Sequence, residues 1–138
     1  MSAESIYVVA GALLDFPRIL IAQRPPGKHM AGGWEFPGGK LHRGESVAQC
    51  LHRELREELG VQVLDASPVI QYEHQYDDRT VLLDLWLVTK YSGAPVAAEG
   101  QAIQWVDIAA LDDVGLLAAD KPMIEPLRAA IKDYVAGT

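Results

Sequence analysis

The sequence lacks the features that mark membrane-spanning and secreted proteins. No apolar run reaches the roughly 20 residues that a helix needs to cross a bilayer. The N-terminal residues have no basic segment followed by a cleavable apolar one, so we expect no signal peptide there and predict a first strand instead. The only cysteine, Cys50, excludes an internal disulfide and fits a reducing compartment, which predicts a cytoplasmic location. Its place within a predicted helix favours packing over a nucleophilic role.

A basic surface is also missing. Twelve Lys and Arg stand against 19 Asp and Glu, which gives a net charge of −7, and the sequence shows no cluster of Lys and Arg. Proteins that bind DNA or RNA normally carry a basic footprint, so we predict no nucleic-acid polymer as a partner. A small polyphosphate stays compatible with this charge, because a divalent metal can lie between two sets of negative groups.

The composition and the order of elements indicate one folded domain, residues 1–138. Of the 138 residues, 49% are hydrophobic, which is enough for a proper core. Periodicity and turn residues predict strands at 6–15, 18–25, 34–36, 61–76, 79–91 and 101–108, and helices at 47–59, 108–114 and 121–135. A Gly/Pro-rich loop covers 25–33, and tight turns are expected at 15–17, 37–40 and 77–79. This order predicts an α+β (α/β) fold with a mixed sheet sandwiched between helices.

The helix at 47–59 has the clearest ends. Ser46 is a good N-cap, and Gln49 three residues later completes a capping-box pattern. Gly60 stands where a left-handed residue commonly ends a helix. Its predicted buried stripe consists of Val47, Leu51, Leu55 and Leu59.

Three glutamates crowd the second half of this helix. Glu54, Glu57 and Glu58 share one side of it, where they repel one another and the partly negative helix end. These three carboxylates form either an ordinary solvent-exposed face or a cation-binding site. The Gly-rich segment 37–40 lies just upstream and can expose backbone groups to a ligand. Carboxylate and carbonyl oxygens are ligands that Mg²⁺ or Mn²⁺ takes.

The spacing around these glutamates resembles that of a known family. The positions concerned are Gly39, Glu45, Arg53, Glu54, Leu55, Glu57, Glu58, Gly60 and Val61. They match the Nudix box, Gly-x5-Glu-x7-Arg-Glu-apolar-x-Glu-Glu-x-Gly-apolar, at every specified position. Segments 22–40, 77–79, 98–101 and 119–122, together with Trp105, also resemble the MutT branch of the Nudix hydrolases. Without that resemblance, Trp105 is interpreted as a core strand residue.

The resemblance implies the Nudix fold and Mg²⁺-dependent hydrolysis of a nucleoside triphosphate to the monophosphate and pyrophosphate, with Mn²⁺ as the alternative metal. It implies metal ligands at Gly38, Glu54, Glu57, Glu58 and Glu99. Glu54 is the expected general base and Arg53 the catalytic residue that orients it, while Glu45 is expected to hold the loop to the helix. Glu99 also fits an exposed loop acid with no metal role.

The resemblance places the substrate around the Gly/Pro-rich loop. The implied substrate-binding residues are Arg24, His29, Glu35, Phe36, Pro37, Gly38, Arg79 and Asp120. Several also fit plainer interpretations: His29 as a loop histidine, Phe36 as a buried strand residue and Arg79 as a solvated hairpin residue. Asp120, followed by Pro122, equally fits a helix N-cap.

The identity of the base depends on Asp120. MutT proteins that discriminate 8-oxoguanine have Asn at the matching position, whose amide both donates and accepts, whereas an ionised Asp only accepts. We predict 8-oxo-dGTP as the first substrate and nucleotide-pool sanitation as the role, with CTP or 5-methyl-dCTP as the alternative. A nucleotide-sensing module without catalysis is a remote third hypothesis. We expect a monomer or weak homodimer.

Overall fold

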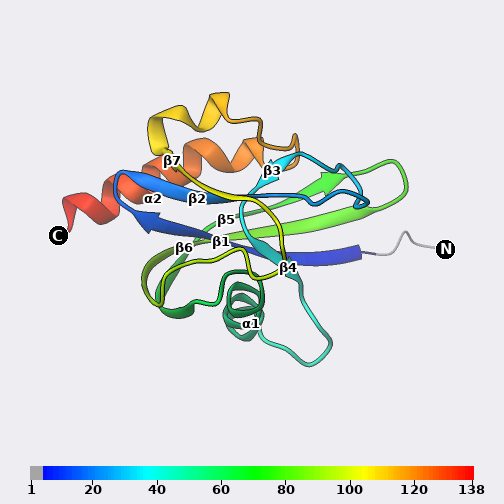
Figure 1. Cartoon of the computed structure of the whole chain (residues 1–138), viewed down its shortest axis with the longest axis horizontal. Helices are drawn as coiled ribbons and strands as arrows, with labels where there is room; N and C mark the ends of the chain where they lie inside the picture. Colours follow the sequence, from blue (N-terminus) through cyan, green and yellow to red (C-terminus); the bar gives the residue numbers. More distant parts are fainter. Residues whose placement is uncertain (1–4) are drawn as a thin grey trace.

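The computed structural model describes residues 5–138, and its strands form one mixed sheet (Figure 1). The strands are β1 (Ser5–Asp15), β2 (Arg18–Gln23), β3 (Trp34–Glu35), β4 (Gly38–Lys40), β5 (Gln62–Gln75), β6 (Thr80–Ser92) and β7 (Ile103–Asp107). The sheet has the order β3-β2-β1-β6-β5, with β4 paired to β1 and β7 to β2. Strands β1 and β6 run parallel, and the other pairs are antiparallel. Strand β1 is therefore the centre of the sheet.

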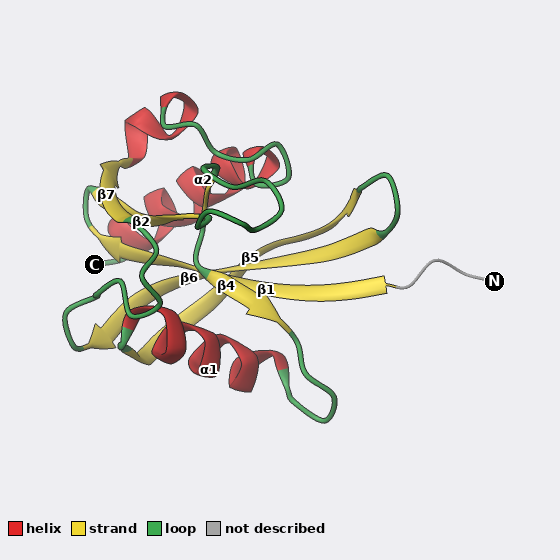
Figure 2. Ribbon diagram, turned by 45° about the vertical axis from the view of Figure 1, so that its right-hand side comes forward, coloured by secondary structure: helices red, strands yellow, loops and turns green. Residues whose placement is uncertain are grey.

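Helices cover both faces of the sheet. Helix α1 (Val47–Leu59) lies on one face, and α2 (Ile124–Ala136) lies on the other with the short 3₁₀ helices η1 (Ile108–Asp113) and η2 (Lys121–Met123). Figure 2 shows α1 and α2 on opposite sides of the strands. The predicted sandwich of a mixed sheet between helices is confirmed.

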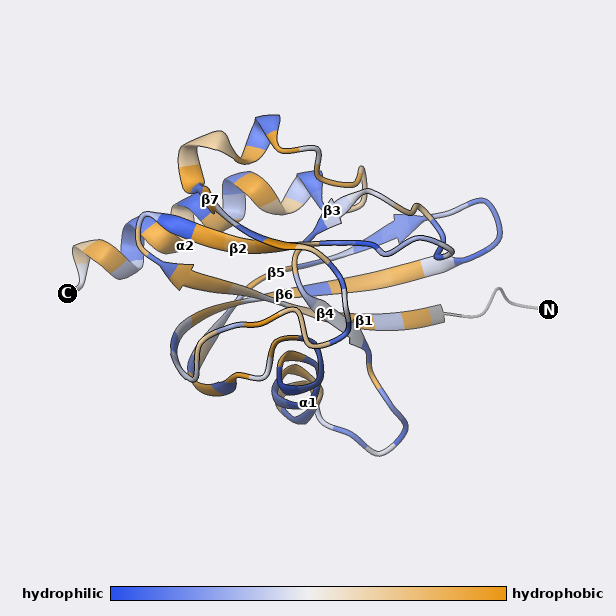
Figure 3. Cartoon of the chain, in the orientation of Figure 1, coloured by the Kyte–Doolittle hydropathy of each residue, from blue (hydrophilic) through white to orange (hydrophobic). Residues whose placement is uncertain are grey.

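Alternation along β1 divides the hydrophobic core into two parts. Ala10, Ala12 and Leu14 belong to the core under α2, whereas Val9 and Leu13 belong to the core under α1. Successive strand residues point to opposite faces, so a central strand between two helical layers is apolar on both faces. Hydrophobic residues accordingly dominate β1 and β2 where they pass between the helices (Figure 3).

Gly11 lies where α1 packs against β1. A β-carbon at this position would lie 2.8 Å from Leu55 Cδ1 and 2.9 Å from Leu51 Cδ1. Its backbone N–H donates to the Pro37 carbonyl at 2.8 Å. Gly11 thus lets the helix approach the sheet closely and ties β1 to the segment that leads into β4.

Helix α1 begins and ends where the sequence predicts. The Ser46 side chain accepts the Gln49 N–H, and the Gln49 side chain accepts the Ser46 N–H, which is a complete capping box. Gly60 has a left-handed φ of 70° and donates its N–H to the Arg56 carbonyl. The fully buried face consists of Cys50, Leu51, Leu55 and Leu59. Cys50 is therefore a packing residue, as expected.

Two local predictions need correction. Residues 37–40, expected to form a turn, instead continue into strand β4, where Gly38 lies opposite Ala10 and Gly39 opposite Val9. A β-carbon on Gly38 would collide with the Val9 carbonyl, so glycine here permits a close strand pairing rather than a turn. The expected helix at 108–114 is the 3₁₀ helix η1.

None of the helices described by the structure is both long enough and apolar enough to span a membrane.

Candidate active site

A polar cavity of about 480 Å³ opens where β4, the end of α1 and the loop before β7 meet. Its lining residues are Val8, Ala22, Gln23, Arg24, Pro25, Lys28, Glu35, Gly38, Gly39, Lys40, Glu58, Glu99 and Gln101. The cavity thus brings together Gly38, Glu58 and Glu99, three of the five metal ligands that the resemblance implies. We call it the acidic cavity.

Glu58 is held against the backbone of β4. Its Oε2 accepts the Gly38 N–H at 2.8 Å. The pKa of Glu58 is raised to about 8, chiefly by burial and also by the carboxylates of Glu54, Glu35 and Glu99, whereas the Gly38 N–H acts to lower it. A carboxyl group with these neighbours is short of positive charge.

Glu54 lies directly beneath Gly39. A β-carbon at Gly39 would collide with the Glu54 carboxylate, whose side chain is 14% exposed. The glycine that opens the Nudix-box pattern therefore makes room for a glutamate from the helix. In physical terms, this contact explains why the pattern combines a glycine in β4 with a glutamate in α1.

Arg53 joins the acidic groups of the box. Its guanidinium contacts Glu45 at 2.6 Å, Glu54 at 2.7 Å and Glu57 at 3.4 Å, and it donates to the Lys40 carbonyl at 3.0 Å. Hydrogen bonding to Arg53 lowers the pKa of Glu45 to about 2. Glu45 also accepts the His42 N–H at 3.0 Å. The arrangement matches the expectation that Arg53 ion-pairs inside the box and that Glu45 ties the loop to the helix.

Within residues 5–138, no three His, Cys, Asp or Glu side chains lie close enough together to hold a metal ion. In this geometry Glu54 and Glu57 ion-pair with Arg53, whereas Glu58 accepts the Gly38 N–H. The donor set still suits a hard divalent cation, since the carboxylates of Glu58 and Glu99 and the strand backbone at Gly38 line one cavity.

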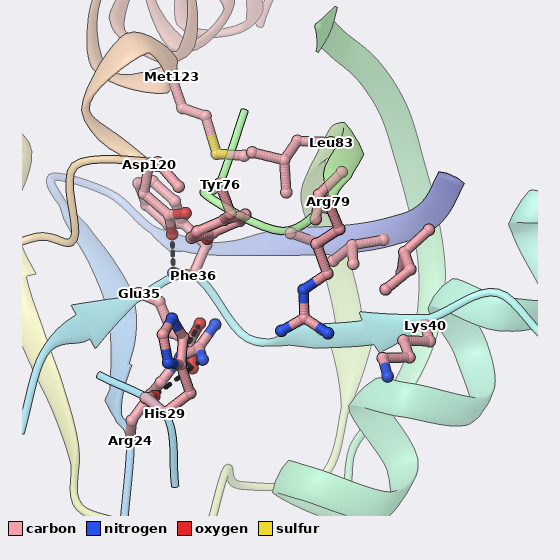
Figure 4. A pocket seen from close by; sticks show the side chains of 16 residues that line it. Arg24, His29, Glu35, Phe36, Lys40, Tyr76, Arg79, Leu83, Asp120 and Met123 are labelled. Carbon is pink, nitrogen blue, oxygen red and sulfur yellow. Dashed lines mark hydrogen bonds and ion pairs between the residues drawn. The ribbon is translucent and has the colours of Figure 1, made fainter. Parts of the chain in front are cut away.

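A second cavity, of about 150 Å³, adjoins the first and is lined by Arg24, Glu35, Gly38, Lys40 and Val8 in common with it. Its other lining residues are Ile6, Ala10, His29, Phe36, Tyr76, Arg79, Val81, Leu83, Ala119, Asp120 and Met123. Figure 4 shows Asp120 and Met123 at one end, with Arg79 and Lys40 toward the other. We call it the inner cavity.

Asp120 is a buried carboxyl in the inner cavity, 7% exposed. Its Oδ2 accepts the Phe36 N–H at 3.0 Å. The pKa of Asp120 is raised to about 7, chiefly by burial and also by Glu35, whereas the Phe36 N–H and Arg24 act to lower it. Asp120 does occupy the N-cap position of η2, with Pro122 in the first turn, but its side chain makes no cap hydrogen bond. The carboxyl points across the fold instead and accepts the buried N–H of Phe36.

The remaining substrate candidates gather around the same opening. Arg24 Nε lies 3.1 Å from Glu35 Oε1, and Arg24 Nη1 donates to the His29 carbonyl at 3.0 Å (Figure 4). The His29 ring lies edge-on to Tyr76, with ring centroids 5.9 Å apart. Within the described chain, Arg79 Nε is buried without a hydrogen-bond partner. Arg79 thus lines the inner cavity rather than being a fully solvated hairpin residue.

Four of the implied residues line neither cavity, namely Pro37, Arg53, Glu54 and Glu57. The Pro37 carbonyl accepts the Gly11 N–H. The Glu57 side chain is 52% exposed and ion-pairs with Arg53. The polar lining residues that had no role assigned from the sequence are Gln23, Lys28, Lys40, Tyr76 and Gln101. Gln101 belongs to the segment 98–101 that resembles the MutT branch and lies two residues after Glu99, and this proximity was the available sequence signal for a place at the site.

The comparison with known proteins agrees with this geometry. A family model described as a NUDIX domain matches residues 9–126. The 8-oxo-dGTP diphosphatase of Escherichia coli (strain K12) is 36% identical over 110 residues, which are 80% of this chain and 85% of that protein. The CTP pyrophosphohydrolase of the same strain is 38% identical over 126 residues, 91% of this chain and 93% of that protein.

Solved structures give the same result. A structure of MutT, from a study of Aliivibrio salmonicida and Vibrio cholerae, has a TM-score of 0.79 and 36% identity, covering 92% of this chain and 99% of that one. The solution structure of the E. coli ORF135 protein has a TM-score of 0.82 and 37% identity, covering 92% and 91%. With the glycine–glutamate contact of its box, its fold and its relatives in agreement, this chain belongs to the Nudix hydrolase family.

Proposed function

We propose that the chain is a Mg²⁺-dependent nucleoside triphosphate pyrophosphohydrolase that releases the monophosphate and pyrophosphate. The observation that carries this proposal is the half-buried Glu58 carboxyl, held against the Gly38 N–H in an acidic cavity beside a second cavity that holds Asp120. One cavity suits a polyphosphate with its metal and the other suits a base. The relatives described above hydrolyse nucleotides by name, and they support the same reaction.

The metal ligands we propose are the Gly38 carbonyl and the carboxylates of Glu54, Glu57, Glu58 and Glu99, with Mg²⁺ as the ion and Mn²⁺ as the alternative. A bound divalent ion would neutralise phosphate charge and lower the pKa of an attacking water. Glu54 would accept the proton of that water, and Arg53 would orient Glu54 through the contact of 2.7 Å. Glu57 would have to turn away from Arg53 to take part, which its exposure allows.

The substrate residues we propose surround the inner cavity. Phe36 forms an apolar wall for the base, and Asp120 meets its polar edge. Arg24, His29 and Arg79 supply donors for the phosphates and sugar, and Arg79 has a buried Nε with no hydrogen-bond partner among the described residues, although Asp78 lies 4.0 Å away. Glu35 holds Arg24 in place, whereas Pro37 and Gly38 shape the backbone between the two cavities.

We propose 8-oxo-dGTP as the first substrate. An Asp with a pKa of about 7 is partly protonated at neutral pH, and the protonated carboxyl both donates and accepts, as the amide of Asn does. CTP or 5-methyl-dCTP is the second candidate. It is favoured by the CTP pyrophosphohydrolase relative, which matches 91% of this chain. A nucleotide-sensing module without catalysis is disfavoured, because every box glutamate is present.

The deciding experiment measures pyrophosphate release with Mg²⁺ from 8-oxo-dGTP, dGTP, CTP, 5-methyl-dCTP and dATP at low micromolar concentration. A preference of roughly a hundredfold or more for 8-oxo-dGTP over dGTP, about 2.7 kcal/mol of discrimination, supports the sanitising role. A flat profile or a cytosine preference keeps the reaction and overturns that role. No release from any of them overturns the proposed reaction and favours the non-catalytic module.

We further propose that the protein works in the cytoplasm as a monomer or weak homodimer. Its one cysteine, Cys50, is buried and free, which suits a reducing compartment. Sedimentation velocity at micromolar concentration tests the assembly state, and a stable larger oligomer would contradict it.

A further inference from the structure

Gln101 is a buried polar residue whose side-chain amide hydrogen-bonds to the backbone through both its oxygen and its nitrogen. It is 6% exposed. Its Oε1 accepts the Glu99 N–H at 3.0 Å, and its Nε2 donates to the Glu58 carbonyl at 3.0 Å. The two partners fix the orientation of the amide, since a backbone N–H requires the oxygen and a carbonyl requires the nitrogen. The side chain therefore bridges two separate segments of the chain.

One end of this bridge is the C-terminal turn of α1. The last carbonyls of a helix have no partner within it and need donors from elsewhere. The Glu58 carbonyl receives both Gln101 Nε2 and the Ala98 N–H, each at 3.0 Å. The neighbouring Leu59 carbonyl accepts the Val96 N–H at 3.0 Å. The segment 96–101 is thereby laid along the end of the helix that carries Glu58.

The other end of the bridge is a short loop with no packing of its own. Residues 96–100 are all exposed, so no buried apolar side chain positions Glu99. A turn closed by the Gly100 N–H to the Ala97 carbonyl at 3.1 Å gives the loop its local shape. Gln101 is the first buried residue after it, and its amide is the side chain that anchors the Glu99 backbone.

We infer that Gln101 is a positioning residue for metal binding, which holds the loop to the end of α1 so that Glu99 and Glu58 face the same acidic cavity. The inference rests on the proposed metal-dependent hydrolysis, in which both glutamates are ligands. Gln101 itself needs no contact with the metal or the substrate. Groups that orient metal ligands in this way typically contribute about 10-fold to 100-fold in metal affinity.

The test compares Mn²⁺ affinity in four proteins without nucleotide, from the electron paramagnetic resonance signal of free Mn²⁺. They are the wild type, Gln101→Met, Glu99→Gln and the double variant. Methionine keeps the length and burial of glutamine but makes neither hydrogen bond. We expect Gln101→Met to weaken Mn²⁺ binding about tenfold in the wild type and less than about twofold when Glu99 is already Gln.

If Gln101 has only a structural role, Gln101→Met weakens Mn²⁺ binding equally in the wild type and in Glu99→Gln, and this outcome overturns the inference. An unchanged Mn²⁺ affinity in both backgrounds also overturns it. Melting temperatures of the metal-free proteins identify a folding defect. If Gln101→Met fails to fold, Gln101→Asn replaces it, because an amide one methylene shorter cannot reach both partners. The same preparations are assayed for pyrophosphate release. If the wild type releases no pyrophosphate, the proposed function is overturned. If the wild type is active but Gln101→Met leaves its Mn²⁺ affinity unchanged, only the positioning role of Gln101 is overturned.

Discussion

Two carboxyls, the half-buried one of Glu58 and the buried one of Asp120, each accept one backbone N–H, and they face different cavities. Burial raises the pKa of both, to about 8 for Glu58 and about 7 for Asp120. Glu58 has other carboxylates as neighbours, which suits a cation. Asp120 has an apolar wall, which suits a ligand that exchanges hydrogen bonds with a partly protonated acid. The same residue type thus supports two different kinds of recognition.

Glu54→Gln is expected to reduce turnover by about 100-fold or more while the fold stays intact. The change keeps the volume beneath Gly39 but removes the group that would accept a proton or bind the metal. Pyrophosphate release gives the rate, and circular dichroism with a melting curve gives the fold. Glu73→Gln, the same change at an exposed position on β5, is the control and should leave the rate unchanged. Turnover within tenfold of the wild type would show that the role assigned to Glu54 is wrong.

Asp120→Asn is expected to remove a pH dependence of stability. The pKa of Asp120 rises from the ordinary 3.8 to about 7 on folding, so the folded chain holds more protons than the unfolded chain between these values. The contribution of Asp120 to the free energy of unfolding is therefore full below about pH 4 and falls as the pH rises to about 7.

Urea denaturation of both proteins at a series of pH values measures this difference. The stability of Asp120→Asn relative to the wild type should increase by a few kcal/mol between pH 4 and pH 7 and then level off. A constant difference would mean that Asp120 titrates in the folded protein as it does in the unfolded chain. The same variant should also change the ranking of bases in the nucleotide panel, as expected of a residue at the base edge.

At the scale of elements, the site depends on how closely α1 approaches β4. Gly11 allows the helix to pack against β1, and Gly39 leaves room for the Glu54 carboxylate under β4. The capping box at Ser46 holds the other end of the helix. Position and stability of the helix are thus separate properties, controlled by different residues.

Gly39→Ala is expected to lower turnover by about 100-fold with little loss of secondary structure, because the added methyl group displaces the Glu54 carboxylate by a distance of the order of 1 Å. Ser46→Ala is the matched control at the other end of α1. It should lower stability by about 1 kcal/mol and leave turnover nearly unchanged. Urea midpoints and pyrophosphate release measure both effects. Equal losses of turnover in the two variants would mean that helix stability, rather than the Gly39 contact, controls activity.

At the scale of the whole molecule, the two faces of the sheet contribute to different cavities. The core under α2 closes one side of the inner cavity through Met123 and Leu83, whereas α1 on the other face supplies Glu58 to the acidic cavity. Strand β4 lies between the two cavities, and Gly38 lines both. Substrate and metal would therefore meet along one strand.

Saturating Mg²⁺ is expected to raise the melting temperature by several degrees. A cation that binds only the folded chain stabilises it by about 2.7 kcal/mol at 100 times its dissociation constant, and it also relieves the repulsion among Glu54, Glu58 and Glu99. Differential scanning fluorimetry at matched ionic strength, with Na⁺ in place of Mg²⁺ as the control, measures the shift. An unchanged melting temperature would contradict metal binding by these glutamates.

Much of the fold was predictable from local patterns. The ends of α1 followed from Ser46, Gln49 and Gly60, and the hairpin of β5 and β6 followed from two apolar runs around a polar tip. The segment at 37–40 was not predictable in this way, because consecutive glycines fit a tight turn as well as a close strand pairing. Only the approach of β1 distinguishes the two.

The sequence by itself determined the family, the box glutamates and the two helical layers, because these depend on spacing and periodicity that neighbouring residues specify. Tertiary structure decided what the distant residues do. Asp120 meets Phe36, and Gln101 joins Glu99 to the end of α1, through contacts between segments far apart in the chain. Such contacts leave no periodic trace in a sequence. Their physical cause is burial, which obliges each polar group to find whichever partner the fold brings within reach.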